Sequence, residues 1–575
     1  MRQWSAKVSG RAIARLSLAA LALAAACGGS SDSTGPINGG GGGDGFGLTA
    51  GNTLAASNAQ PVQLAGGTTG MEMLLVVNDT STGADGTTNF TISATGISAP
   101  GAVSAPSTSL IPAPAGLFAG FDASAATRLD ISYGARVNER FRPRLNGMMS
   151  SARAARSLAP SAPSLAAQVG DVVSYNVNDS SCTIIDRHPA RIVAVSAQAV
   201  IAVDTLNPPG GFSSADYQRF AANFDTLIYP VDVGNFGAPA DIDGNGKVVL
   251  LFTRAVNALT PRNNPSFVGG FFLSRDLFPT VATARLDGCP GSNMAEMFYL
   301  LAPDPTGAVN GNVRTAAFVD SLTTGVIAHE FQHLINASRR IYVNNANELE
   351  VSWLNEGLSH IAEELLFFRQ GQVGPRQNIG ITALRASELT RNAFNNDQAA
   401  NASRYRSYLQ SPNDNSPIRD DDSLATRGAT WDLLRYLADR KTAGGGTDAS
   451  VWQALVNAKT TGIANLRQVF GANIGAQLRD WSVSHYTDDV VSNLSPDYSQ
   501  PSWNWHSIYP VLSGNAPYPL KINQLTSTPA SGTVIPGGAA FYRFSVPANA
   551  TGSLTLTKST GTTTGPLQGV VVRLR

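Results

Sequence analysis

Charged side chains are scarce in this 575-residue chain: Asp, Glu, Lys and Arg make up 14 % of it, where about 25 % is usual. The 41 basic residues balance the 41 acidic ones, so the formal net charge is zero. Such a chain has no excess of positive charge with which to hold a phosphate backbone. We therefore expect no nucleic-acid partner.

Long apolar runs are also lacking, because a membrane-spanning helix needs about 20 apolar residues and the apolar stretch at 16–26 has only eleven. It follows a short basic leader, which is typical of an export signal. The run that ends at Cys27 resembles a bacterial lipoprotein box. That resemblance implies lipidation of Cys27 and an exported protein that faces the periplasm or the exterior, with this anchor as its only membrane contact. The alternative is an ordinary secreted protein with an incidental cysteine.

Cysteine is rare, with three residues in all. If Cys27 carries lipid, Cys182 and Cys289 remain, and paired thiols oxidise outside the cytoplasm. We predict one disulfide between them, with two unpaired buried thiols as the alternative. A bridge of this span would remove unfolded-state entropy worth about 4 to 5 kcal/mol in the chain model.

Changes in composition divide the chain into segments. Short β-branched runs between turn residues predict strands near both ends, and the middle of the chain has strand patterns first and helical patterns second, which favours an α+β core. We expect a multidomain protein in which N- and C-terminal all-β modules flank this core. The segments are a signal peptide (1–26), a Gly-rich tether (27–45), a β-sandwich-like module (46–135), a linker (136–168), the core (169–515, sheet-rich at 169–314 and helical at 315–515) and a second β-module (516–575).

Histidine is scarce too, yet His329, Glu330 and His333 form an H-E-x-x-H motif inside an apolar, helix-like stretch. Two histidines four residues apart share one face of a helix, so both imidazoles can bind a single Zn²⁺. Glu330 is displaced by one residue and can reach a metal-bound water as a general base. The motif therefore predicts a catalytic zinc site.

A catalytic zinc takes three protein ligands and leaves one position open. Asn336 and Arg339 stand where a metzincin has glycine and histidine, which excludes that class. A gluzincin instead takes a glutamate from a second helix. Here the segment 353–358 opens a second amphipathic run, in which 22 residues separate Glu356 from His333. We predict Glu356 as the third ligand.

At this point the sequence resembles the gluzincin zinc metallopeptidases, most closely the hyicolysin-type family. The resemblance implies a zincin-type core, one catalytic Zn²⁺ and endopeptidase activity on proteins or peptides. It also implies His329, His333 and Glu356 as ligands and Glu330 as base. It covers roughly residues 170–490, through the segments 241–246, 295–299, 329–336 and 353–360.

Other polar residues near the expected site are candidates for supporting roles. Several gluzincins place a tyrosine three residues before a helix-opening glycine, where this chain has Ala425. The second oxyanion donor is then sought among His485, ranked slightly first, Arg427, His360 and Tyr486. His360 and Glu363 follow Glu356 on one helix face. For His360 we expect either a contact with substrate or a capping role in a polar network. For Glu363 we expect either an orienting bond to a ligand histidine or a solvated position.

Asp241, Asp243 and Asn245 present oxygen side chains at alternate positions, with Gly246 after them, as in the first half of an EF-hand calcium loop. Phe252 occupies the twelfth position, where an EF-hand has glutamate, so this is no EF-hand. A shortened Ca²⁺ loop and a plain Asx–Gly turn both remain open.

Taken together, the sequence predicts an envelope-anchored, zinc-dependent endopeptidase with a candidate Ca²⁺ loop. The alternative is a catalytically retired, surface-binding lipoprotein on a zincin scaffold, which the missing tyrosine favours. The retained base Glu330 argues against that alternative.

Overall fold

The computed structural model describes residues 50–56, 60–83, 86–101, 132–151, 167–264, 266–283, 286–514, 516–559 and 566–575. These residues belong to one compact unit, Ile37–Arg575. The predicted signal peptide, the Gly-rich tether and the lipidation site Cys27 lie outside the described residues.

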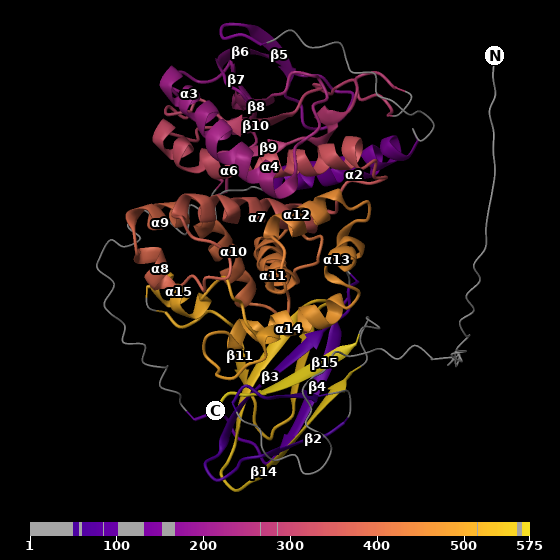
Figure 1. Cartoon of the computed structure of the whole chain (residues 1–575), viewed down its shortest axis with the longest axis vertical. Coiled ribbons are helices and arrows are strands. Elements are labelled where there is room, and N and C mark those ends of the chain that lie inside the picture. The colour runs from indigo at the N-terminus through magenta and orange to yellow at the C-terminus, as the bar shows by residue number, and fades with distance from the viewer. Residues whose placement is uncertain are drawn as a thin grey trace, which may run out of the picture. The chain divides into compact units, whose positions relative to one another are not determined.

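A six-stranded mixed sheet forms the first part of the core, with the strand order β5-β6-β7-β8-β10-β9 (Figure 1). Strands β7, β8 and β10 run parallel to one another, whereas β6 runs antiparallel to β7 and β9 runs antiparallel to β10 at the edge. Strand β8 is buried along its whole length, because its run of apolar residues is covered on both faces. The strands are β5 Val172–Asn176, β6 Arg187–Val195, β7 Ala199–Asp204, β8 Val248–Thr253, β9 Gly270–Phe272 and β10 Met297–Leu301.

Helices dominate the second part of the core, and α6 packs against both the sheet and α7. Threonine and serine residues begin several of them: the hydroxyl of Thr315 accepts from Phe318 N–H at the start of α6, and that of Ser423 accepts from Thr426 N–H at the start of α11. The long helices are α6 Ala316–Ser338, α7 Ser352–Gly371, α10 Ala399–Leu409, α11 Leu424–Ala443 and α14 Ile474–Thr487.

Shorter elements complete the core. Helices α3 and α4 are joined by a π-helical turn, and two further π-helical turns follow α6 and α9. They are α3 Ser214–Asn223, α4 Tyr229–Phe236, α5 Arg254–Ala258, α8 Ile381–Arg385, α9 Glu388–Ala393, α12 Asp448–Asn457, α13 Gly462–Phe470, α15 Trp505–Leu512, the π turns η1 Phe224–Ile228, η3 Arg339–Val343 and η4 Phe394–Gln398, and the 3₁₀ turns η2 Ser274–Leu277 and η5 Pro496–Tyr498.

Strands from both ends of the chain build a single β-sandwich, which corrects the expectation of two separate β-modules. One sheet has the order β1-β15-β3-β13-β11 and the other β12-β4-β14-β2, so indigo and yellow strands alternate in Figure 1. No two of the strands β1 to β4 are hydrogen-bonded to each other, so their neighbours in both sheets come from the C-terminal end of the chain. The strands are β1 Thr53–Ala56, β2 Val62–Ala65, β3 Met71–Asp79, β4 Thr88–Thr95, β11 Ile522–Gln524, β12 Ala530–Val534, β13 Ala539–Val546, β14 Thr551–Lys558 and β15 Leu567–Arg573.

Strand β3 joins the sandwich to the core. Its side chains alternate between the two faces of the sheet: Met73 and Leu75 lie in the apolar interior of the sandwich, whereas Leu74 and Val76 belong to the large apolar cluster of the core. Helix α14 packs against this strand. The sandwich and the core therefore share a continuous buried interface.

Helix α2, Ser132–Ser151, falls mostly in the segment expected to be a linker. It packs against β9, η2 and α7, and its apolar residues Val137, Phe141 and Leu145 are buried in the core cluster. Its apolar face explains the difference from the expected linker, because burial of those side chains fixes the helix on the core.

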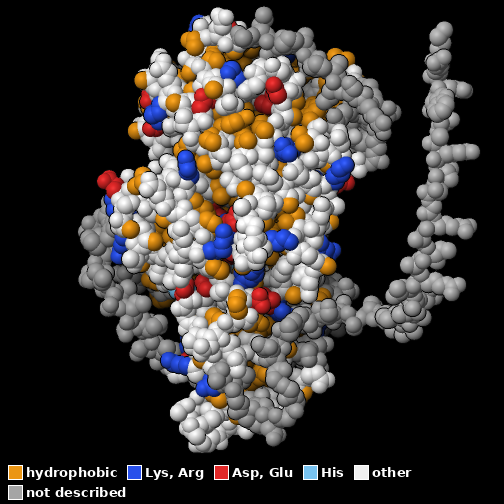
Figure 2. All heavy atoms as spheres, viewed as in Figure 1, with side chains coloured by type: hydrophobic (Ala, Val, Ile, Leu, Met, Phe, Trp, Pro, Cys, Tyr) orange, Lys and Arg blue, Asp and Glu red, His pale blue; other side chains and the backbone are white. Residues whose placement is uncertain are grey.

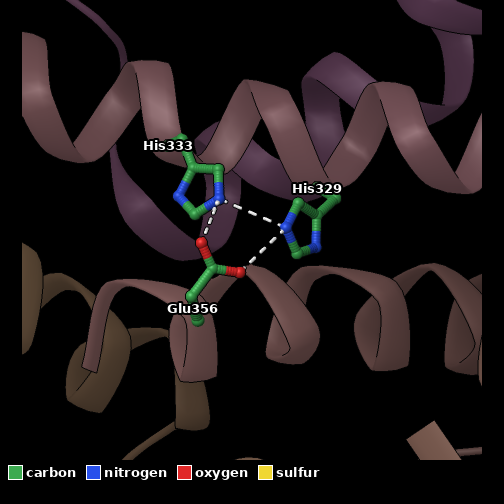
Figure 3. A group of neighbouring side chains, drawn as sticks. All are labelled: His329, His333 and Glu356. Atoms are coloured by element: carbon green, nitrogen blue, oxygen red, sulfur yellow. Dashed lines mark hydrogen bonds and ion pairs between the residues drawn. The ribbon is translucent and has the colours of Figure 1, made fainter. Parts of the chain in front are cut away.

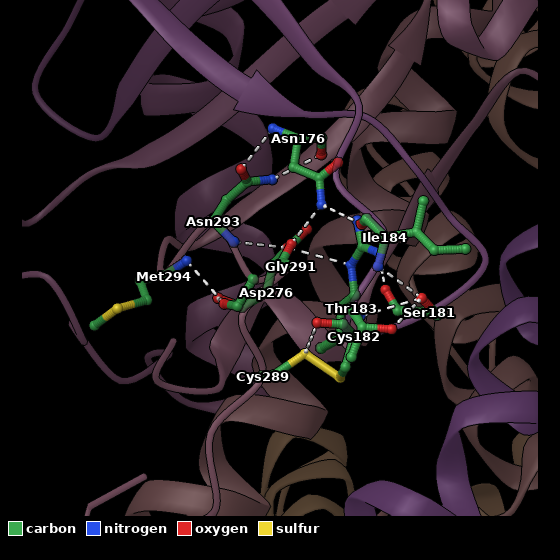
Figure 4. Close-up of a disulfide and its surroundings, with 12 residues drawn as sticks. Asn176, Ser181, Cys182, Thr183, Ile184, Asp276, Cys289, Gly291, Asn293 and Met294 are labelled. Carbon is green, nitrogen blue, oxygen red and sulfur yellow. Dashed lines mark hydrogen bonds and ion pairs between the residues drawn. A yellow bond between two sulfur atoms is a disulfide. The ribbon is translucent and has the colours of Figure 1, made fainter. Parts of the chain in front are cut away.

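Cys182 and Cys289 form a disulfide with their Cα atoms 4.9 Å apart (Figure 4). Both residues are fully buried. Around the bridge, Gly291 N–H donates to Cys182 O over 2.6 Å and Asn176 Nδ2 donates to Gly291 O over 2.7 Å. The bridge and these bonds fasten the segment after β5 to the segment before β10.

The outer surface shows little segregation of charge. On the face drawn in Figure 2, basic and acidic side chains are interspersed among uncharged ones. Among the described residues, no helix combines the length and the apolar character needed to cross a bilayer.

Candidate metal centre

His329, His333 and Glu356 converge at the contact between α6 and α7 (Figure 3). The Nε2 atoms of the two histidines are 3.2 Å apart. His329 Nε2 lies 3.3 Å from Glu356 Oε2, and His333 Nε2 lies 3.3 Å from Glu356 Oε1. The helical spacing of the two histidines and the crossing of the two helices thus produce a triangle of three ligand residues, in which each imidazole faces one oxygen of the carboxylate.

The triangle has the dimensions of a tetrahedral metal site. An ion with bonds of about 2.0 to 2.1 Å in tetrahedral geometry keeps its ligand atoms about 3.3 to 3.4 Å apart. Glu356 Oε1 is buried and accepts no hydrogen bond. The three residues therefore fit a metal ion with nitrogen and oxygen ligands.

The electrostatics of the site also favour a cation. Burial alone would lower the pKa of His329, but Glu356 and Glu363 outweigh it and raise that pKa to about 9. Burial would raise the pKa of Glu356, but Arg427 and the two histidines hold it well below its ordinary value. The carboxylates thus stabilise positive charge where the two imidazoles meet.

The Nδ1 atom of each histidine has a hydrogen-bonding partner on α7. Glu363 Oε1 lies 2.8 Å from His329 Nδ1, and Ser359 Oγ lies 3.0 Å from His333 Nδ1. A carboxylate on Nδ1 leaves Nε2 free to ligate and fixes the orientation of the ring. The structure therefore places Glu363 where it can orient a ligand histidine, on the face of α7 that also carries Glu356.

Arg427 contacts the third ligand. Its Nη1 donates to Glu356 Oε2 over 2.6 Å, and its Nε donates to Asp422 Oδ1 over 2.9 Å. The guanidinium is buried, and it lies between two carboxylates. This geometry makes Arg427 a residue that positions Glu356.

Glu330 lies beside the triangle and is almost fully buried. Its Oε2 accepts a hydrogen bond of 2.8 Å from Phe272 N–H on the edge strand β9, whereas its Oε1 has no partner. Burial raises the pKa of Glu330, although the two histidines oppose the shift. One oxygen is thus anchored, and the other remains free to exchange a proton.

His360 lies behind the ligands. Its Nδ1 is 3.3 Å from Glu363 Oε1 and 3.4 Å from Arg404 Nη1. Burial lowers its pKa to about 3, so the ring is neutral at ordinary pH. Its partners belong to the polar network that supports Glu363, and this placement favours the capping role over substrate contact.

The structure does not bring His485 to the triangle, which corrects the expectation that it donates to the reaction centre. Its Nδ1 lies 2.8 Å from the Tyr405 hydroxyl, and its ring packs against Trp481 and against Phe541 of the sandwich. Burial lowers its pKa to about 3. Its ring contacts are thus aromatic side chains, and α14 presents His485 to the sandwich. Its neighbour Tyr486 stacks edge-on against His506.

The candidate calcium residues occupy the loop between α4 and β8. Carboxylate oxygens of Asp241, Asp243 and Glu296 lie within 4.8 Å of one another. The Asn245 side chain instead donates to Asp243 Oδ2 over 2.7 Å. Glu296 was not foreseen, because it precedes β10 and lies far away in the sequence.

Sequence reasoning also missed three supports of the metal centre: Ser359, Arg404 and Asp422. Each contacts a ligand or the residue that holds one. A signal existed for Ser359, which follows Glu356 by three residues and so shares its helix face. Arg404 and Asp422 come from other elements, and no local pattern marks them.

Comparison with known proteins supports a relationship to metalloproteases. A stretch of 148 residues is 29 % identical to the neutral metalloprotease ShpI of Staphylococcus hyicus. The match covers 26 % of this chain and 30 % of that protein, so it spans less than a third of either. No protein-family model matches the chain.

Proposed function

We propose that this protein is a zinc-dependent endopeptidase of the gluzincin type, with a zincin-type core. The observation that carries the proposal is the triangle of His329, His333 and Glu356. Beside it lies Glu330, whose Oε1 has no hydrogen-bond partner. The relationship to a metalloprotease supports the choice of peptide bonds as substrate. Two nitrogen ligands and one carboxylate are a donor set typical of catalytic zinc.

Zn²⁺ held by these three residues would supply a Lewis acid that polarises a peptide carbonyl and acidifies a water molecule. Glu330 Oε1 takes the proton of the attacking water and returns it to the leaving amine. The bond from Phe272 N–H to Oε2 holds the carboxylate in place during both transfers. Arg427 keeps Glu356 ionised and oriented, and Glu363 does the same for His329 through Nδ1.

Replacement of the base tests the proposal. Glu330→Gln keeps the volume and can still accept from Phe272 N–H, but it cannot take up a proton. We expect hydrolysis of a denatured protein to fall by about 10² to 10⁴, while metal analysis shows one zinc per chain. Glu348→Gln, at an exposed position, is the matched control and should leave both quantities unchanged.

The retired-enzyme alternative predicts a different result. Wild-type protein with one zinc and no hydrolysis would favour a non-catalytic scaffold. Undiminished hydrolysis by Glu330→Gln would show that another residue is the base.

We further propose that the protein acts outside the cytoplasm. The buried disulfide between Cys182 and Cys289 supports this, because such bonds persist in oxidising compartments.

A further inference from the structure

The loop at residues 240–247 and the start of β10 enclose a second group of carboxylates. Glu296 Oε1 accepts a hydrogen bond of 2.7 Å from Ile242 N–H, which fixes the side chain against the loop. Its Oε2 is buried and has no hydrogen-bond partner. A carboxylate oxygen of Glu296 lies within 4.8 Å of carboxylate oxygens of both Asp241 and Asp243.

Three carboxylates in such proximity repel one another unless a proton or a cation intervenes. Burial, reinforced by Asp243 and Asp241, raises the pKa of Glu296 to about 8, and burial raises that of Asp243 to about 6. Their oxygens are hard ligands, and Asp241 is exposed, so water can complete a coordination shell of six to eight.

We infer that Asp241, Asp243 and Glu296 bind a structural Ca²⁺ ion. The ion would tie the loop that enters β8 to the residue that enters β10, two neighbouring parallel strands of the core sheet. Asn245 supports the site through its bond to Asp243 and is not needed as a side-chain ligand. Lys247 Nζ donates to Ser196 O over 2.5 Å and so fastens the end of the loop to the turn before β7.

Calcium titration of the zinc-loaded protein tests the inference without any reference to hydrolysis. We expect one Ca²⁺ per chain and a rise in Tm that grows with calcium concentration, since binding to the folded state alone stabilises it. Glu296→Gln keeps the bond from Ile242 N–H but removes the charge, and it should abolish both effects. Glu388→Gln, at an exposed position on α9, is the control and should respond like wild type.

The inference would be overturned if the Tm of the wild-type protein did not change with calcium, or if the Glu296→Gln variant still gained stability from calcium. An equal rise in Tm with Mg²⁺ would also overturn it, because Mg²⁺ prefers a more regular octahedral shell.

A separate observation concerns α2, which covers the open edge of β9. Asn138 Nδ2 donates to Phe272 O over 2.7 Å, and Asn138 Oδ1 accepts from Ser274 N–H over 2.9 Å. A side-chain amide has the donor and the acceptor of a peptide group, so Asn138 pairs with the edge as an added strand would. The same residue, Phe272, donates its N–H to Glu330.

Helix α2 also reaches the other side of the metal centre. Arg136 pairs with Asp422 over 3.5 Å, and Asp422 binds the Arg427 that holds Glu356. Between α2 and the ends of α6 and α7 one cavity measures about 30 Å³, and a wider hollow of about 650 Å³ lies between α2, Ser352 and the segment 420–422. His329, His333, Glu330 and Glu356 are each at most 4 % exposed.

The geometry points to α2 as an inhibitory segment that occupies the position of the substrate. This second inference rests on the proposed peptidase function, since it takes β9 as the strand on which a peptide docks. With α2 in place the peptide edge is paired and the metal centre is closed; displacement of α2 opens both.

Asn138→Ala in the full chain tests this role, because it removes the paired amide and leaves the metal ligands intact. We expect kcat/KM on a peptide substrate and the rate at which a chelator removes zinc to rise about tenfold or more, given the loss of hydrogen bonds to Phe272 O, Ser274 N–H and Ser274 Oγ. Arg144→Ala, at an exposed position on α2, is the control.

The two readouts separate this inference from the proposed function. Faster zinc removal without any hydrolysis would support the covering role and contradict the peptidase. Unchanged rates of both processes, or reduced activity in a variant with wild-type Tm, would overturn the inhibitory role of α2.

Discussion

The guanidinium of Arg427 positions Glu356, the ligand that comes from the second helix of the metal centre. Arg427 spans Glu356 and Asp422, and it outweighs the effect of burial on the pKa of Glu356. A carboxylate that is held ionised in this way loses no binding energy to a competing proton. The sequence had offered Arg427 as an oxyanion donor, and the contact with Glu356 now favours a positioning role.

Removal of this guanidinium distinguishes the two roles. We expect Arg427→Ala to weaken zinc binding by about 10- to 100-fold, the usual cost of losing a residue that supports a ligand, with activity restored at high zinc concentration. Competition with a chelator of known affinity measures the effect. An oxyanion donor would behave differently: kcat would fall while zinc affinity stayed the same.

Asp432 gives the fold a pH dependence. Burial raises its pKa to about 7, although Trp481 Nε1 and Trp505 Nε1 donate to it. Between about pH 4 and pH 7 the unfolded chain has lost this proton and the folded protein retains it, so the contribution of Asp432 to stability falls as the pH rises through that range. Asp432→Asn should flatten this part of the curve of unfolding free energy against pH. Parallel curves for both proteins would contradict the assignment.

At the scale of elements, Gly428 lets two helices approach closely. A Cβ atom at this position would lie 2.2 Å from Tyr405 N and 2.3 Å from Arg404 C, both backbone atoms of α10. Neighbouring residues on these two helices, Arg427 and Arg404, contact Glu356 and Glu363. The spacing of α10 and α11 therefore sets the position of both arginines.

Gly428→Ala should separate these helices. We expect a loss of at least about 1 to 3 kcal/mol in unfolding free energy, together with weaker zinc binding, because the arginines move away from the carboxylates. Denaturant unfolding and zinc titration measure the two effects. Gly444→Ala, where no atom lies within 4 Å of the added carbon, is the control; equal behaviour of the two variants would refute the steric argument.

How much the sequence could predict depended on the distance between partners. His329 and His333 are related by helical spacing, so their shared face, with Glu330 one residue further along the helix, could be derived from the sequence. The partners of Glu296 and Asn138 lie in distant elements, and only the packed structure brings them together. His485 shows a further limit: helical register predicts which residues share a face but not what that face meets.

At the scale of the whole molecule, the sandwich and the core should unfold as one unit, because β3 is buried on both sides. Phe544→Ala, inside the sandwich, should cost about 3 to 5 kcal/mol and lower the Tm of a single calorimetric transition that also releases the zinc. Gln63→Ala, on β2, removes only an exposed hydrogen bond and should leave the Tm nearly unchanged. Two transitions, of which only one shifts, would show that the parts unfold separately.

The composite sandwich also imposes an order of events on a growing chain. Gln63 and Ser553 are hydrogen-bonded across a separation of 490 residues, and at about 5 to 20 residues per second a ribosome takes tens of seconds to cover that distance. Throughout this interval β2, β3 and β4 are without the neighbours that will cover their edges. The strands made first are the last to be completed, so the cell must keep them apart from other chains until the final strands arrive.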